Sequence, residues 1–248
     1  MTKSRSGTTR LRALGVALGI LCSGSLMVVS ALPASASSLT SSLGAYWTSA
    51  PTIGGNIYLT SASTTFVVPT VNCAGQTRHL GDNFGVEEGA GGAFIGYIQA
   101  LVTTECKKAT PSYHFRVAVG TTAFTEVGVS PGDTVVASWF YTSSLSEAIV
   151  HDLTSGYTWD AVGAAPPTAL SSPADIGEFD LETATNSSLA PAPFGKATFT
   201  QSEVNGDYLG FGNNIAAYNL QLDKRGLNET TGPIGSDQES FTVTFDKI

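Results

Sequence analysis

Short apolar or alternating segments, separated by turns, recur along the chain from about residue 60 to its end. After the first 36 residues, no segment keeps the roughly 3.6-residue apolar spacing of a helix. Strands spaced at roughly 8–12 residues are typical of a β-sandwich or barrel. The segments predicted as strands are 64–69, 93–102, 113–119, 135–142, 147–153, 157–159, 176–182, 194–200, 215–222 and 240–246.

Residues 81–92 are dense in glycine and contain the acidic pair Glu87-Glu88. We predict a turn region here, because glycine is common where the chain must turn. A nucleotide-binding loop is not indicated, because neither Gly-Lys-Ser/Thr nor G-x-G-x-x-G follows a strand in this stretch. The chain has no internal repeat and no linker long enough to separate two domains, so residues 37–248 are expected to form one all-β domain.

Residues 1–36 have the pattern of a secretory signal peptide. Four basic residues precede an apolar stretch that ends near residue 32, and Ala34-Ser35-Ala36 follows as a small-residue cleavage site. Glycine, serine and Pro33 interrupt the apolar stretch, which favours cleavage over a membrane anchor. We therefore expect a secreted, extracellular protein with no membrane partner after cleavage.

Removal of the signal peptide leaves 8 basic and all 20 acidic residues, a net charge of −12. A surface this acidic repels nucleic acid and anionic membranes, so neither is expected as a partner. The charge fits a secreted protein that stays folded at low pH, where fewer carboxylates are ionised. We expect the mature chain to be a monomer.

Cys73 and Cys106 remain in the mature chain. An even pair in an oxidising compartment predicts a disulfide bond. The three histidines are scattered, with no H-x-H or H-E-x-x-H spacing, so neither a metal nor another cofactor is expected.

Glu178, Asp180 and Glu182 alternate along the predicted strand 176–182. Because strand side chains alternate between faces, the three carboxylates are expected on one face, about 7 Å apart from one to the next. Like charges at this range raise one another's pKa unless they are solvated or paired. The group is therefore either a solvated face of an acidic protein or a catalytic carboxylate site.

Gln99 lies on an otherwise apolar face of the predicted strand 93–102. A buried amide without hydrogen-bond partners costs about 1–3 kcal/mol. Gln99 is therefore either a structural hydrogen-bonding residue or part of a site.

Several motifs follow one another in a defined order along the mature chain: Trp47, 66–73, Gly85-Val86-Glu87, Ile98-Gln99-Ala100, 129–133, 152–156, 177–182, 194–200 and 240–244. Their order and spacing resemble those of the glutamic peptidases, or eqolisins, including secreted bacterial homologues. The resemblance covers nearly the whole mature chain, and no single motif carries it.

This resemblance implies an antiparallel two-sheet β-sandwich of the concanavalin A-like jelly-roll kind. It also implies acid-acting endopeptidase activity on a polypeptide substrate, with the catalytic dyad at Gln99 and Glu182. A glutamate that is ionised at mildly acid pH can take a proton from water as the water attacks a peptide carbonyl. A glutamine can donate to the developing oxyanion and hold the water through its own carbonyl, so this chemistry requires no cofactor.

The chain departs from the family at positions that flank the dyad. Asn83 stands where the family has Trp, Glu87 where it has Asp, and residues 113–117 contain no acid where the family has a Trp-x-Glu strand. Asp180 adds a carboxylate near Glu182 and should raise the pKa of Glu182. The residues expected to position substrate are Glu87, Asn83, Tyr113, Phe115, Asp180 and Glu178. We expect a divergent member with shifted specificity or weak activity, and an inactive relative is an alternative.

Two other functions are compatible with the acidic strand. Glu178, Asp180 and Glu182 also resemble the E-x-D-x-E strand of β-glucanases, in which the first Glu is the nucleophile and the last the acid/base. A non-enzymatic carbohydrate- or protein-binding β-sandwich is the second alternative. Dependence on Gln99 distinguishes the peptidase from the glucanase, which would depend on Glu178.

The cleavage site gives a direct prediction. The secreted protein should begin at Ser37, because signal peptidase requires small residues at positions 34 and 36. Intact-mass measurement of the protein recovered from the medium checks this start, and Ala36→Arg should leave the signal peptide attached. If the wild-type protein in the medium has the mass of the full 248-residue chain, the signal-peptide assignment is contradicted.

Overall fold

The computed structural model describes residues 39–41, 43–49, 60–88, 98–120, 122–164, 174–180, 190–211, 214–220 and 228–246. Within these ranges the regular structure consists of sixteen β-strands, and no helix is present. No helix in the described ranges is long and apolar enough to cross a membrane.

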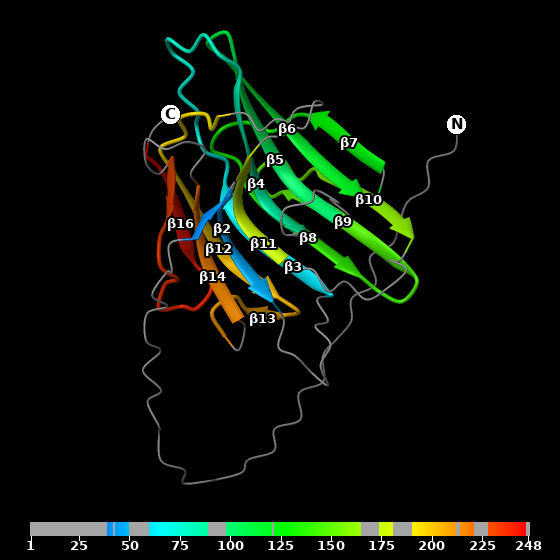
Figure 1. The fold of residues 1–248 in the computed structure, drawn as a ribbon. Helices are drawn as coiled ribbons and strands as arrows, with labels where there is room; N and C mark the ends of the chain where they lie inside the picture. Colours follow the sequence, from blue (N-terminus) through cyan, green and yellow to red (C-terminus); the bar gives the residue numbers. More distant parts are fainter. Residues whose placement is uncertain are drawn as a thin grey trace, which may run out of the picture. The chain divides into compact units, whose positions relative to one another are not determined.

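The first sheet has eight strands in one continuous order (Figure 1). All its pairings are antiparallel except the one between its first two strands, which is parallel. The order is β1 (Leu39–Ser41), β14 (Asn214–Leu220), β2 (Leu43–Ser49), β11 (Ala174–Asp180), β4 (Leu80–Glu88), β5 (Ile98–Lys107), β6 (Thr110–Val119) and β7 (Thr122–Val127).

The second sheet is antiparallel throughout. Its order is β10 (Thr158–Ala164), β9 (Leu145–Asp152), β8 (Thr134–Tyr141), β3 (Ser61–Val67), β12 (Lys196–Val204), β16 (Phe241–Phe245) and β15 (Glu229–Thr231), with β13 (Asp207–Tyr208) paired to β12. The two sheets share one hydrophobic core, so the predicted all-β, two-sheet antiparallel sandwich is confirmed.

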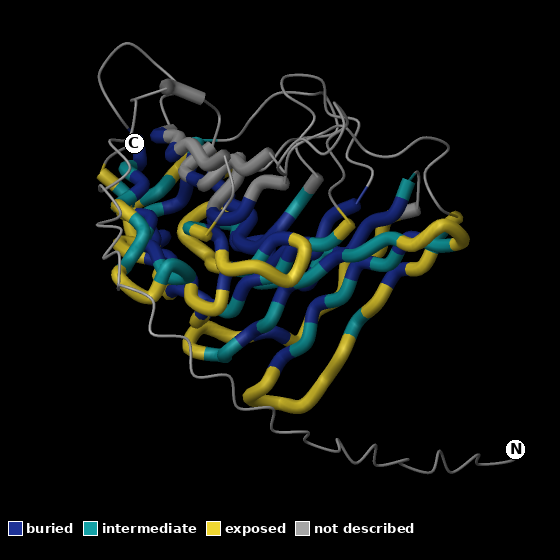
Figure 2. Tube along the Cα trace, turned by 90° about the horizontal axis from the view of Figure 1, so that it is seen from below, coloured by how far each residue is buried: buried dark blue, intermediate teal, exposed yellow. Residues whose placement is uncertain are grey.

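Alternation of side chains places one face of each sheet in this core. Along β3, β8 and β9, buried residues alternate with half-buried or exposed ones. Figure 2 shows buried and less buried residues alternating in this way along neighbouring strands. The alternation explains why these strands were predictable from the sequence: one face meets the core and the other meets solvent.

Phenylalanine rings connect the two sheets across the core. Phe66 on β3 lies between Phe199 on β12, with ring centroids 5.5 Å apart, and Phe84 on β4, at 6.4 Å. Phe84 also meets Phe194 edge to face at 5.1 Å. Aromatic pairs at these separations add about 0.5–1.5 kcal/mol each beyond the area they bury. Strand β4 is therefore fixed against the second sheet by Phe84.

The predicted turn at residues 81–92 is wrong for its first eight residues, which belong to the inner strand β4. The prediction took these glycines as turn residues, but Gly85 lies within a strand and allows the backbone of β5 to come close. It has φ +147° and pairs with Leu101, and a Cβ on Gly85 would overlap the carbonyl oxygen of Ala100 and lie 3.2 Å from the Cα of Leu101. On the other side it pairs with Gly177, whose φ is +149°.

The predicted disulfide between Cys73 and Cys106 is confirmed, with Cα atoms 5.4 Å apart. It joins the loop after β3 in the second sheet to the end of β5 in the first. Closure of a loop of 33 residues stabilises a fold by about 3–4 kcal/mol in the chain-entropy account.

Replacement of Gly85 tests the close approach of β4 and β5. We expect Gly85→Ala to lower the free energy of unfolding by about 3–4 kcal/mol, because it adds a steric clash to an unfavourable φ. Gly75→Ala is the matched control: Gly75 also has positive φ, +74°, but no atom lies within 4 Å of the point that a Cβ would occupy there. The control should cost only about 1 kcal/mol in urea unfolding, and equal losses in both variants would contradict the steric account.

Candidate functional site

Gln99 lies on the face of β5 that points away from the inter-sheet core. Its neighbours Ile98 and Ala100 are core residues. Leu101, which shares the face of Gln99, packs with Ala45 in a separate small cluster away from that core. Gln99 is nonetheless only 3% exposed. The first sheet is therefore buried on both faces at this point, and we call the face that carries Gln99 the outer face.

Glu87 on β4 lies directly opposite Gln99. Gln99 Nε2 donates a hydrogen bond to Glu87 Oε2 at 3.0 Å. The contact leaves the second N–H and the carbonyl oxygen of the Gln99 amide for other partners. The structure thus brings together two of the residues predicted for the site, an amide and a carboxylate.

Asn83 lies four residues before Glu87 on the same strand and is paired with Thr103. Thr103 Oγ1 donates to Asn83 Oδ1 at 2.7 Å, and both side chains are buried. Asn83 and Glu87 therefore lie on one face of β4, with Gly85 between them.

Tyr113 and Phe115 lie on the other face of their strand, β6, and the structure does not bring them to Gln99. Phe115 is buried in the core and stacks on Trp159 with ring centroids 4.1 Å apart. Tyr113 packs against the same core, and its hydroxyl oxygen accepts a hydrogen bond from the backbone N–H of Val71 at 3.0 Å. Both side chains hold the sandwich together in this arrangement.

The acidic strand is described only in part. The backbone of β11 places Glu178 opposite Phe84 and Asp180 opposite Asp82. The side chains of Glu178 and Asp180, and the whole of Glu182, lie outside the described residues.

Glu105, further along β5 on the outer face, is the centre of a group of ionisable side chains. His79 Nε2 lies 2.9 Å from Glu105 Oε1, Lys107 Nζ 2.8 Å from Oε2, and His114 Nε2 3.9 Å from Oε2. Burial raises the pKa of Glu105, but hydrogen bonds and charge attraction from Lys107 and His79 outweigh it, so the pKa lies below its usual range.

Arg116 on β6 was missed by reasoning from the sequence. It lies opposite Leu101, between His114 and Ala118 on the outer face. The sequence offered a partial signal: Arg116 is a cation on the predicted strand 113–119, which lacks the family's acid, but alternation alone does not say which face of that strand carries Gln99.

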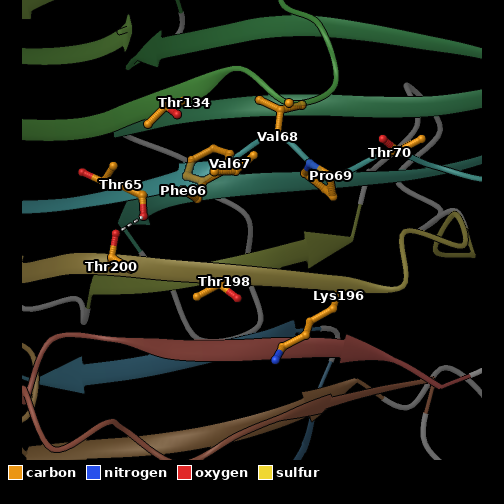
Figure 3. Close-up of a pocket in the computed structure, with 11 residues that line it drawn as sticks. Thr65, Phe66, Val67, Val68, Pro69, Thr70, Thr134, Lys196, Thr198 and Thr200 are labelled. Atoms are coloured by element: carbon orange, nitrogen blue, oxygen red, sulfur yellow. Dashed lines mark hydrogen bonds between the residues drawn. The ribbon is translucent and has the colours of Figure 1, made fainter. Parts of the chain in front are cut away.

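A groove of about 480 Å³ lies elsewhere, on the outward surface of the second sheet between β3, β8 and β12. Figure 3 shows Thr65, Thr198 and Thr200 along it, with Lys196 near one end. None of the predicted site residues lines it, and its lining residues include no carboxylate that could act as a general base. Within the described ranges, no three His, Cys, Asp or Glu side chains gather as a metal site would require.

The described residues thus define an all-β sandwich that carries, on the outer face of one sheet, a buried amide paired with a half-buried carboxylate. Its fold is shared with glutamic peptidases of known structure. Scytalido-glutamic peptidase, solved with a peptide-based transition state analog, matches with a TM-score of 0.58 and 12% identity over 82% of this chain and 98% of that one.

Two further solved structures agree. SCP-B, a member of the eqolisin family in complex with the tripeptide Ala-Ile-His, matches with a TM-score of 0.59 and 13% identity over 82% of this chain and 96% of that one. Aspergilloglutamic peptidase from Aspergillus niger matches with a TM-score of 0.50 and 19% identity over 67% of this chain and 99% of that one. At these identities the likeness shows the fold. No family profile matches the sequence, and no curated protein does.

The Glu105 group predicts a pH-dependent contribution to stability. Because the pKa of Glu105 is lowered in the folded state, its contribution is complete above the unfolded pKa of about 4.3 and is lost as pH falls through the folded value. Glu105→Gln should therefore lower the free energy of unfolding by about 1 kcal/mol at pH 6–7, and the deficit should shrink below about pH 4.

Urea unfolding across this pH range measures the effect. Glu126→Gln is the control, because Glu126 is exposed on β7 and makes no ion pair among the described residues. A deficit of the same size at pH 3 and pH 7 would contradict the assignment.

Proposed function

We propose that this protein is a secreted acid endopeptidase that hydrolyses peptide bonds with Gln99 and a glutamate as its catalytic pair. The observation that carries the proposal is the position of Gln99. It is buried on the outer face of a sheet whose fold is that of the glutamic peptidases, and it is hydrogen-bonded to a carboxylate. The peptides bound to the similar proteins support a polypeptide as the substrate class.

Glu182 is the proposed general base. As a carboxylate it takes a proton from water while the water attacks the peptide carbonyl, and as an acid it returns the proton to the leaving amine. Gln99 holds the water through its carbonyl oxygen and donates its free N–H to the oxyanion that forms. Neither step requires a covalent bond to the protein.

Glu87 has a separate role in this mechanism. Because it accepts one N–H of Gln99 at 3.0 Å, it fixes which way the amide faces. A glutamine that rotated freely would present its oxygen and nitrogen interchangeably to water and substrate. Glu87 is therefore proposed as a positioning residue that keeps the donor and the acceptor of Gln99 in their catalytic places.

The register of β11 makes the choice of base worth testing. Ile176 faces the core, so residues 178, 180 and 182 would also face the core if side chains kept alternating along the strand. The strand ends at Asp180. Glu182 can therefore pair with Gln99 on the outer face only if this alternation is interrupted after Asp180. Glu87 already contacts Gln99.

The experiment is cleavage of an unfolded protein substrate between pH 2 and 7 by the mature chain and its variants. We expect cleavage at acid pH, with a loss of about 100-fold or more in kcat for Gln99→Ala and Glu182→Gln, in line with removal of an oxyanion donor or a general base. Glu87→Gln should lower kcat less, and Glu87→Asp should restore part of it.

Other outcomes would change the proposal in defined ways. Full activity of Glu182→Gln with loss of activity in Glu87→Gln would make Glu87 the base. No proteolysis by the folded wild-type protein at any pH would overturn the peptidase function. Hydrolysis of β-glucan that depends on Glu178, or glycan binding without hydrolysis, would then identify the alternative.

A further inference from the structure

Arg116 is a diagonal neighbour of Gln99 on the outer face. Gln99 pairs with Ala118 on β6, and Arg116 lies two residues from Ala118 on the same strand, opposite Leu101. Diagonal neighbours on adjacent strands have Cα atoms about 7–8 Å apart. An arginine side chain spans that distance, so its guanidinium lies within reach of a group bound at Gln99.

The guanidinium has no anionic partner in the described part of the chain. Arg116 is half-buried, its Nε is inaccessible to solvent, and that nitrogen has no hydrogen-bond partner. No ion pair joins Arg116 to a described carboxylate. A buried N–H donor without a partner costs free energy, so the Nε of Arg116 marks a place where a bound acceptor would be favourable.

The carboxylates that share this face among the described side chains are already engaged. Glu87 accepts a hydrogen bond from Gln99, and Glu105 is held by His79 and Lys107. Arg116 is therefore left as a cation on the face that carries Gln99 and Glu87, in a protein with a large excess of acid. A cation here offsets the repulsion that the rest of the surface exerts on an acidic ligand.

We propose that Arg116 is a specificity-determining residue that binds a carboxylate of the substrate. The substrate class is a polypeptide with Asp or Glu near the cleaved bond, and the inference rests on the proposed peptidase function of this site. A guanidinium binds a carboxylate through two parallel N–H···O bonds. An extended chain advances about 3.3 Å per residue, so the recognised carboxylate belongs to a residue within about two positions of the bond at Gln99.

The test uses peptides that differ only in charge. Cleavage sites in an unfolded protein are mapped by mass spectrometry, and matched peptides are made with Glu or Gln at each position within two residues of the bond. At pH 5.5, kcat/KM of the wild-type protein should favour Glu over Gln by about tenfold at one position, the size of effect expected of one charge-assisted contact.

The variants assign the preference to Arg116. Arg116→Gln should bring the Glu/Gln ratio close to one, and Arg116→Lys, which keeps the charge but loses the planar fork, should retain an intermediate ratio. Arg78→Gln is the matched control, because Arg78 is exposed in the loop before β4. It should keep the wild-type ratio. Circular dichroism and urea unfolding establish that each variant is folded.

The outcomes separate this inference from the proposed function. Cleavage by the wild-type protein with no preference for Glu at any position would overturn the role of Arg116 and leave the peptidase function intact. If the wild-type protein cleaves nothing, the peptidase function fails, and carboxylate recognition is then tested by fluorescence anisotropy with labelled unstructured peptides of one sequence that carry either Glu or Gln. Tighter binding of the Glu peptides that is lost in Arg116→Gln would support carboxylate recognition, and equal binding would overturn it.

Discussion

The burial of strand β4 on both faces is the constraint on which the described site depends. One set of its side chains, including Phe84 and Val86, enters the core between the sheets. The alternate set, including Asn83 and Glu87, faces hydrogen-bond partners on β5. Gly85 lets the neighbouring backbone come close. A one-residue slip would move Phe84 out of the core and Glu87 away from Gln99 at the same time, so packing of the core also fixes the polar pair.

Among the described side chains, the carboxylates Glu105 and Glu87 on the outer face are stabilised in different ways. Lys107 and His79 satisfy Glu105, while the uncharged amide of Gln99 satisfies Glu87. An amide can accompany a carboxylate without adding a second charge to desolvate, which suits a site that is mostly buried. Arg116 is the exception, and the unpaired, buried Nε of its guanidinium is the physical reason to look for a ligand there.

The similarity to glutamic peptidases lies in the backbone more than in the side chains. Matches at 12–15% identity cover 82% of this chain with TM-scores of 0.57–0.59. A sandwich tolerates extensive substitution as long as alternation and core volume are kept, so fold outlasts sequence. The proposed function depends on a handful of outer-face residues, and there the chain has its own combination of Asn83, Glu87 and Arg116.

The sequence alone determined what depends on local period and on pairs of special residues. Alternation predicted most strands of the second sheet, and the even cysteine pair predicted the Cys73–Cys106 bond. Tertiary structure decided which face of each strand meets the core. Alternation alone could not show that Phe115 enters the core while Arg116 shares the outer face with Gln99, because side chains on both faces of the first sheet are buried or half-buried there. Alternation also could not place Glu87 opposite Gln99. The composition of residues 81–88 indicates a turn, and the register of this strand is set by its packing against distant parts of the chain.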